Sequence, residues 1–140
     1  MKVLFVDDEG RRMEAVVEEL KESGHEVNFQ ASMDPALAIL ADQNQRFDVV
    51  IFDVSMPSGK TFQAEDTDGG ARTGLNFYAA LRQLRPKLKA VVFTNVADRG
   101  VEEHFKKQDR SLCLFIRKPS VLPFQFVEEL EGFVGVTEVT

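Results

Sequence analysis

Apolar and polar positions follow one another along this chain in a pattern that predicts strands and helices in turn. Short runs of apolar or β-branched residues lie at about 2–6, 47–52, 89–93 and 112–117. Runs of this length are typical of strands that are buried on both faces of a parallel sheet. Between the runs, apolar residues recur at helical spacing, as expected for helices that connect parallel strands by right-handed crossovers. The pattern therefore predicts an α/β fold with a doubly wound parallel sheet.

A further strand is predicted at the edge of this sheet. In the segment at 25–31, the apolar residues Val27, Phe29 and Ala31 alternate with polar ones. Such alternation indicates an edge strand with one face in solvent. The chain then has five strands, and a helix is predicted after each of them, at about 11–23, 33–42, 74–85, 97–107 and from 123 onward.

One polar stretch, residues 57–73, interrupts the pattern. It contains three glycines and no apolar period, which predicts a long inserted loop between the third strand and the third helix. Such a loop is either an inert surface insertion or an element that covers the site beside which it begins. The remainder is predicted to form a single domain over residues 1–134 with a short C-terminal tail at 135–140, and leaves no room for an output domain.

Composition narrows the classes of partner. The net charge is -6 and basic residues occur in short groups, which argues against a nucleic-acid surface. The single cysteine, Cys113, lies inside an apolar run, so a disulfide framework or a cysteine-rich metal site is excluded. The first strand begins at Lys2, which leaves no room for a signal peptide, and no apolar stretch approaches the roughly 20 residues that span a bilayer. We therefore expect a cytoplasmic protein without membrane contact.

Polar residues stand where four of the predicted strands end. Asp7 and Asp8 follow the first run, Asp53 the second, Thr94 the third, and Lys118 the last. The carboxyl ends of parallel strands meet at one edge of the sheet, which is where open α/β sheets bind ligands. Each residue alone is as readily explained by a solvated turn or a helix cap. Their coincidence at four strand ends indicates a shared site.

Three carboxylates at one sheet edge repel one another unless a cation neutralises them. An all-oxygen cluster without histidine or cysteine selects a hard ion such as Mg²⁺. An aspartate beside such an ion can attack phosphorus, while a lysine and a threonine stabilise the added oxygens. This set of residues therefore favours phosphorylation of an aspartate.

With these motifs, the sequence resembles the receiver domain of two-component response regulators from Lys2 to about Phe133. The resemblance is carried by VDDE at 6–9, IFDVSMP at 51–57, FTN at 93–95 and FIRKP at 115–119. It implies a flavodoxin-like fold with strand order 2-1-3-4-5 and five helices, similar to that of stand-alone chemotaxis regulators. It also implies that the loop at 57–73 is an insertion, because the corresponding turn is usually short in receivers.

The resemblance implies a magnesium site in which Asp53 is the phosphoacceptor. Asp8, Asp53 and the carbonyl oxygen of Ser55 are expected to bind Mg²⁺ directly, and Asp7 is expected to assist through water. These residues are therefore the candidate metal ligands of the chain.

The resemblance also implies how a phosphoryl group is held and sensed. Thr94 and Lys118 are expected to bind its oxygens, and Thr94 and Phe115 are expected to form the switch. The peptide bond between Lys118 and Pro119 is expected to be cis.

The implied function is a phosphoacceptor signalling domain, whose only chemistry is its own phosphorylation and dephosphorylation. It would take the phosphoryl group from a histidine kinase or a phosphotransfer protein. Its output would be phosphorylation-dependent protein binding or dimerisation on the face made by the fourth helix, the fifth strand and the fifth helix.

Two other functions stay open on the sequence alone. An aspartate-nucleophile phosphohydrolase usually carries a second aspartate two places after the nucleophile, where this chain has Ser55. An unphosphorylated pseudo-receiver that serves as a scaffold is disfavoured by the complete set of acids, threonine and lysine. Asn95 nevertheless stands where receivers usually have a very small residue after the switch threonine.

Overall fold

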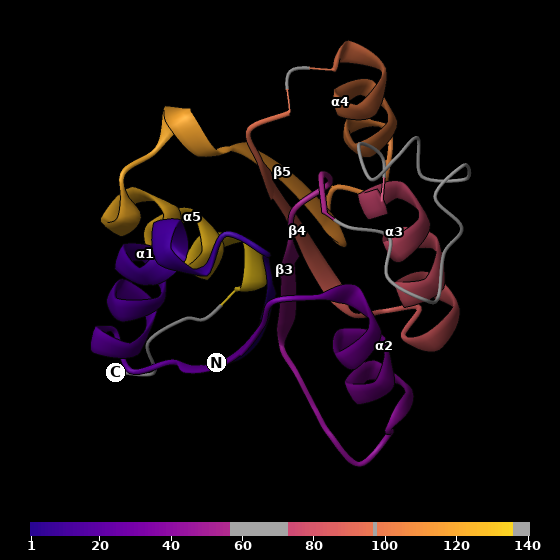
Figure 1. Ribbon diagram of the computed structural model, residues 1–140, viewed down its shortest axis with the longest axis horizontal. Helices are drawn as coiled ribbons and strands as arrows, with labels where there is room; N and C mark the ends of the chain where they lie inside the picture. Colours follow the sequence, from indigo (N-terminus) through magenta and orange to yellow (C-terminus); the bar gives the residue numbers. More distant parts are fainter. Residues whose placement is uncertain (57–72, 97, 136–140) are drawn as a thin grey trace.

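The computed structural model contains a single five-stranded sheet between two layers of helices (Figure 1). It describes residues 1–56, 73–96 and 98–135. All neighbouring strands pair in parallel, in the order β2-β1-β3-β4-β5. The predicted fold class and strand order are therefore confirmed. The strands are β1 (Lys2–Val6), β2 (Glu26–Gln30), β3 (Val49–Phe52), β4 (Lys89–Thr94) and β5 (Cys113–Arg117).

Five helices cover the two faces of the sheet. α1 and α5 lie together on one face, and α2, α3 and α4 lie on the other (Figure 1). Within the described ranges, no helix is long and apolar enough to cross a membrane. The helices are α1 (Gly10–Glu22), α2 (Met33–Ala41), α3 (Thr73–Leu84), α4 (Arg99–Lys106) and α5 (Pro123–Val134), and a short 3-10 turn, η1 (Lys118–Ser120), precedes α5.

The two-sided covering explains the apolar runs of the sequence. In β1 and β3, the stretches Val3–Val6 and Val49–Phe52 are fully buried, because each face of these strands meets a layer of helices. β2 is only partly buried, as predicted for an edge strand. On the side of α3 and α4, the ring of Phe52 packs against those of Phe77 and Phe105, with centroids 5.1 and 6.0 Å apart. The residues at the carboxyl edge thus extend from strands that are packed on both faces.

The N-terminus of α4 lies two residues later than the sequence pattern predicts. Asp98 is its N-cap, and the side chain accepts hydrogen bonds from the backbone N–H groups of Gly100 (2.8 Å) and Val101 (3.2 Å). A capping aspartate satisfies backbone donors that have no partner inside the helix. This cap fixes the start of α4 close to the end of β4.

The described residues on either side of the segment 57–72 lie beside the end of β3. The segment 57–72 and the tail 136–140 fall outside the described residues, so the inserted loop and its function stay predictions. At its base, the hydroxyl of Thr73 donates to the carbonyl oxygen of Met56 (2.5 Å), and the N–H of Gly74 donates to the carbonyl oxygen of Val54 (2.8 Å). The chain therefore leaves the sheet and returns to it at one place.

Candidate functional site

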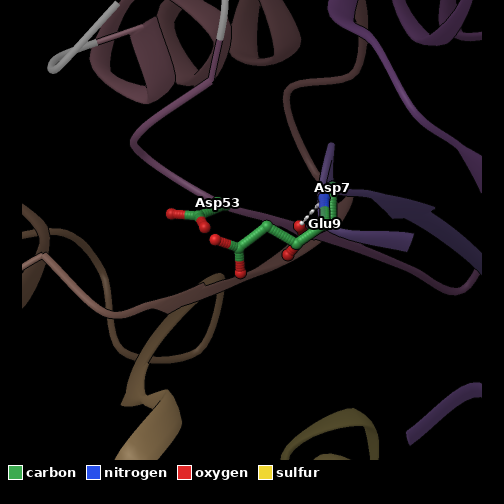
Figure 2. A group of neighbouring side chains, drawn as sticks. All are labelled: Asp7, Glu9 and Asp53. Atoms are coloured by element: carbon green, nitrogen blue, oxygen red, sulfur yellow. Dashed lines mark hydrogen bonds between the residues drawn. The ribbon is translucent and has the colours of Figure 1, made fainter. Parts of the chain in front are cut away.

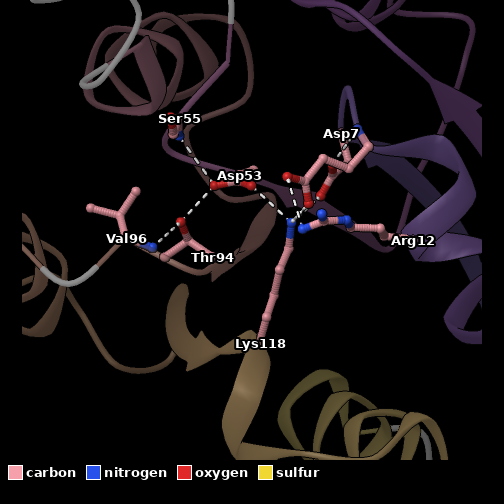
Figure 3. A network of polar contacts seen from close by, with 8 residues as sticks. Asp7, Arg12, Asp53, Ser55, Thr94, Val96 and Lys118 are labelled. Carbon is pink, nitrogen blue, oxygen red and sulfur yellow. Dashed lines mark hydrogen bonds and ion pairs between the residues drawn. The ribbon is translucent and has the colours of Figure 1, made fainter.

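Four polar residues from four different strand ends meet at the carboxyl edge of the sheet (Figure 3). The backbone N–H of Asp7 continues the β1 ladder by donating to the carbonyl oxygen of Gln30 (3.0 Å). In the same way, the N–H of Asp53 donates to the carbonyl oxygen of Val6 (3.3 Å). The positions of these two aspartates are thus set by strand pairing. Thr94 and Lys118 follow from β4 and β5.

Both oxygens of the Asp53 carboxylate are held by hydrogen bonds. The residue is 4% exposed. Its Oδ1 accepts from the hydroxyl of Thr94 (2.5 Å) and from the backbone N–H of Ser55 (3.1 Å). Its Oδ2 accepts from Nζ of Lys118 at 2.8 Å. The Thr94 hydroxyl in turn accepts from the N–H of Val96 (3.1 Å), which fixes its direction (Figure 3). A hydroxyl donor and an ammonium therefore approach Asp53 from opposite sides.

The ammonium of Lys118 is the internal counter-ion of the site. Its Nζ lies 2.8 Å from Asp53, 2.9 Å from Asp7 and 3.3 Å from Glu9. Burial acts to lower its pKa, but the hydrogen bonds and charges of the two aspartates outweigh burial and raise the pKa of Lys118. The side chain therefore stays charged, although it is only 6% exposed.

Asp7 is the least exposed of the three acids that contact Lys118. The residue is 1% exposed, and this burial raises its pKa. The ion pair with Lys118 and a hydrogen bond from the N–H of Glu9 (2.8 Å) oppose the rise without cancelling it. Asp7 is therefore a weaker acid in the folded protein than it is in water.

The third carboxylate beside Lys118 belongs to Glu9, which the sequence did not single out. Carboxylate oxygens of Asp7, Glu9 and Asp53 all lie within 4.8 Å of one another (Figure 2). Asp8, the expected ligand, is exposed and lies outside this group. The pKa of Asp8 is raised by partial desolvation and by the negative charges of Asp53 and Glu9, so Asp8 still interacts electrostatically with the site. The one sequence signal for Glu9 was that VDDE contains three consecutive acids.

The donor set fits a hard divalent cation. Every nearby ligand atom is an oxygen, and the cluster carries three carboxylates against one ammonium. Mg²⁺ prefers such oxygen ligands and few protein groups, with water filling the remaining positions. Ser55, which lies two residues after Asp53, is exposed. The residues present are thus suited to Mg²⁺.

Comparison with known proteins identifies the family of the chain. The family model described as "Response regulator receiver domain" matches residues 3–122. The chain belongs to this family. No curated protein sequence matches it.

Solved structures agree with the assignment to the receiver family. A CheY-like response regulator receiver domain from Methanospirillum hungatei has a TM-score of 0.75 at 21% identity, with 96% of this chain and 93% of that chain covered. The chemotaxis response regulator CheY4 of Vibrio cholerae has a TM-score of 0.69 at 27% identity, with 94% and 97% covered. A response regulator receiver protein from Burkholderia phymatum has a TM-score of 0.71 at 25% identity, with 99% and 98% covered.

The peptide bond between Lys118 and Pro119 in this receiver departs from what the resemblance implied. In the described part of the chain no peptide bond is cis, so the cis form expected between Lys118 and Pro119 is wrong for this structure. The two residues instead begin the 3-10 turn η1. Lys118 still reaches Asp53 from this turn.

Phe115, the expected aromatic switch residue, is half-buried in the receiver. Its ring stacks on that of Phe105 from α4, with centroids 6.4 Å apart. The hydroxyl of Thr94 already points at Asp53. The structure thus places the two switch candidates on β4 and β5, next to α4.

We predict that Asp7→Asn raises the stability of the metal-free receiver at neutral pH by about 0.5–2 kcal/mol, the usual range for one stabilising substitution. Because the folded protein raises the pKa of Asp7, it binds this proton more tightly than the unfolded chain does. Stability is therefore lost as the pH rises through the folded pKa, and the neutral amide avoids that loss. Urea unfolding of both proteins from pH 3 to pH 8 measures the effect. A variant equally destabilised at every pH would contradict it.

Proposed function

We propose that this receiver accepts a phosphoryl group on Asp53 in a reaction that requires Mg²⁺, and that the donor is a histidine kinase or a phosphotransfer protein. The observation that carries the proposal is the placing of the Asp53 carboxylate between a hydroxyl and an ammonium, beside further carboxylates. A carboxylate in this position can act as a nucleophile, and the hydroxyl and the ammonium beside it can stabilise the phosphorylated product from two sides.

The reaction begins with an oxygen of the ionised Asp53 attacking phosphorus. The bond between phosphorus and the donor's histidine nitrogen breaks, and its electron pair leaves with the imidazole. Lys118 and Thr94, which contact the carboxylate at 2.8 and 2.5 Å, lie within reach of the new phosphoryl oxygens. Both donors are therefore preorganised in the unphosphorylated receiver.

Bound Mg²⁺ would supply positive charge that neutralises the carboxylates and the phosphoryl oxygens. The residues that we propose to hold it are Asp8, Asp53 and the carbonyl oxygen of Ser55, with Asp7 acting through water. Asp8 is exposed, so it can contact an ion that enters from solvent. Asp7 is buried, so it would contribute its negative charge without direct contact. This division between direct and indirect ligands accords with their burial.

The output would leave through the face made by α4, β5 and α5. Thr94 drawn towards a phosphoryl group would change the space beside Phe115, and a packed core passes such moves to its neighbours. At the start of α5, Leu122 and Phe124 are 57% and 50% exposed, which is unusual for large apolar side chains. We propose that a protein partner, or a second receiver on phosphorylation, binds there, and that the protein acts in the cytoplasm.

The proposal predicts phosphorylation that depends on both Asp53 and Mg²⁺. We expect acetyl phosphate to add one phosphoryl group to the wild-type receiver and none to Asp53→Asn, as measured by intact mass. Excess chelator should abolish the addition. Asp48→Asn, which alters an exposed aspartate that accepts from the N–H of Lys2, serves as the matched control and should be modified like the wild type. Equal modification with chelator, or of Asp53→Asn, would overturn the proposal.

A further inference from the structure

Glu9 differs from the other two carboxylates that contact Lys118. Its side chain is 35% exposed, whereas those of Asp7 and Asp53 are 1% and 6% exposed. Its contact with Nζ of Lys118 is also the longest of the three, at 3.3 Å. Figure 2 shows the Glu9 side chain reaching from the start of α1 to the neighbourhood of Asp53. Glu9 is therefore the one member of the group that faces both Lys118 and solvent.

Two hydrogen bonds hold the backbone of Glu9 at the start of α1. Its N–H donates to Oδ1 of Asp7 (2.8 Å), and its carbonyl oxygen accepts from the N–H of Met13 (3.1 Å), the first bond of α1. Among the described residues, Glu9 also pairs on the solvent side with Arg12, at 3.9 Å, whose side chain is 75% exposed. Such an exposed pair is weak. Lys118 is thus the main partner that orients the carboxylate.

We propose that Glu9 is a positioning residue that strengthens cation binding and restrains phosphoryl acceptance, because it holds Lys118 in the unphosphorylated arrangement. This inference rests on the proposed function. Glu9 is not among the residues that we propose to hold Mg²⁺. Its effect on cation binding and on phosphorylation would come from its charge and from its contact with Lys118.

The two effects follow from one charge acting in opposite directions. A carboxylate within 4.8 Å of the ligand atoms attracts a divalent cation to the site. The same carboxylate repels the phosphoryl oxygens that phosphorylation adds to Asp53. It also competes for the ammonium of Lys118, which would otherwise be shared only with Asp7 and Asp53. Removal of the Glu9 charge should therefore weaken the binding of Mg²⁺ and strengthen the binding of the phosphoryl group.

The test compares Glu9→Gln with the wild type and with Glu14→Gln. Glu14 is an exposed glutamate further along α1 that is not among the carboxylates contacting Lys118, so its variant has the same change in net charge. Calorimetry measures the Kd of Mg²⁺, and NMR titration at saturating Mg²⁺ measures the apparent Kd of beryllofluoride, which mimics the phosphoryl group. For Glu9→Gln we expect the Kd of Mg²⁺ to rise and the apparent Kd of beryllofluoride to fall. Each should change by about threefold to tenfold, as expected for the loss of one nearby, partly screened charge.

The opposite signs separate a positioning effect from damage to the site. If Glu9 had only a structural role, Glu9→Gln would bind both Mg²⁺ and beryllofluoride more weakly. If only the net charge mattered, Glu14→Gln would show the same changes in affinity as Glu9→Gln. Either result would overturn the inference. Glu9→Asp keeps the charge and should restore most of the Mg²⁺ affinity. If the wild type itself bound neither Mg²⁺ nor beryllofluoride, the proposed function would fail. If it bound both and Glu9→Gln were unchanged, only the inference would fail.

Discussion

Lys118→Ala is expected to lower the free energy of unfolding of the metal-free receiver by about 3–5 kcal/mol, the usual cost of removing one partner of a buried ion pair. The ammonium contacts Asp7 and Asp53 at 2.9 and 2.8 Å, and all three side chains are nearly inaccessible. Without it, the two carboxylates would face each other without compensation. Urea unfolding at neutral pH with chelator present measures the loss.

Mg²⁺ and acid should each reduce the deficit of Lys118→Ala. A divalent cation would replace the missing charge and stabilise the folded state by mass action. Lowering the pH would protonate Asp7, whose pKa is already raised by burial, and so remove the repulsion between the two carboxylates. Lys118 itself adds no pH dependence there, because its raised pKa means that its contribution is complete below the unfolded value of about 10.4 and is lost only above it.

Lys106→Ala provides the control for Lys118→Ala. Lys106 is 60% exposed and pairs with Glu102 at 3.6 Å on α4, so its removal should cost roughly 0.5 kcal/mol or less. Beryllofluoride binding should survive in Lys106→Ala and be lost in Lys118→Ala. Similar stability in the two variants would show that Lys118 is not the counter-ion of a charged site.

Gly74→Ala is expected to damage both stability and phosphoacceptance. A Cβ atom at this position would lie 2.5 Å from Cα of Val54 and 3.2 Å from the carbonyl oxygen of Asp53. Because these are backbone atoms, α3 must move away or the end of β3 must shift. We expect a loss of about 1–3 kcal/mol from overpacking and a phosphorylation rate lower by about tenfold to a hundredfold, since small displacements of a reacting group are costly.

Gly132→Ala is the matched control for Gly74→Ala. Gly132 lies in α5, and an added Cβ would meet no atom within 4 Å. Alanine there should stabilise the receiver by about 0.5–1 kcal/mol, because glycine is unfavourable inside a helix. Chemical unfolding and the time course of labelling by acetyl phosphate distinguish the two variants. Equal behaviour would mean that α3 does not support Asp53 through this close approach.

The sequence predicted those parts of the receiver that depend on periodicity. Apolar runs located the buried strands, and the rule that parallel strands end at one edge predicted that Asp7, Asp53, Thr94 and Lys118 lie together, as they do in the structure. Strand pairing leaves little freedom at such positions, which is why the convergence could be anticipated.

Features that depend on side-chain direction in turns could not be predicted in this way. Three acids follow β1 in succession, and periodicity cannot say which of them faces the sheet edge. The turn into α1 exposes Asp8 and brings Glu9 to Lys118. The hydrogen bond between Thr73 and Met56 was equally hidden, because it joins residues on either side of a long segment without a pattern.

The central claim is that Asp53 carries the phosphoryl group, and reductive trapping tests it most directly. Wild-type receiver is labelled with acetyl phosphate and Mg²⁺ and reduced with borohydride, which converts an aspartyl phosphate to homoserine, and its peptides are sequenced by mass spectrometry. The account predicts homoserine at position 53 and an unmodified aspartate at positions 7 and 8. Homoserine at either of those positions, with position 53 unmodified, would contradict it.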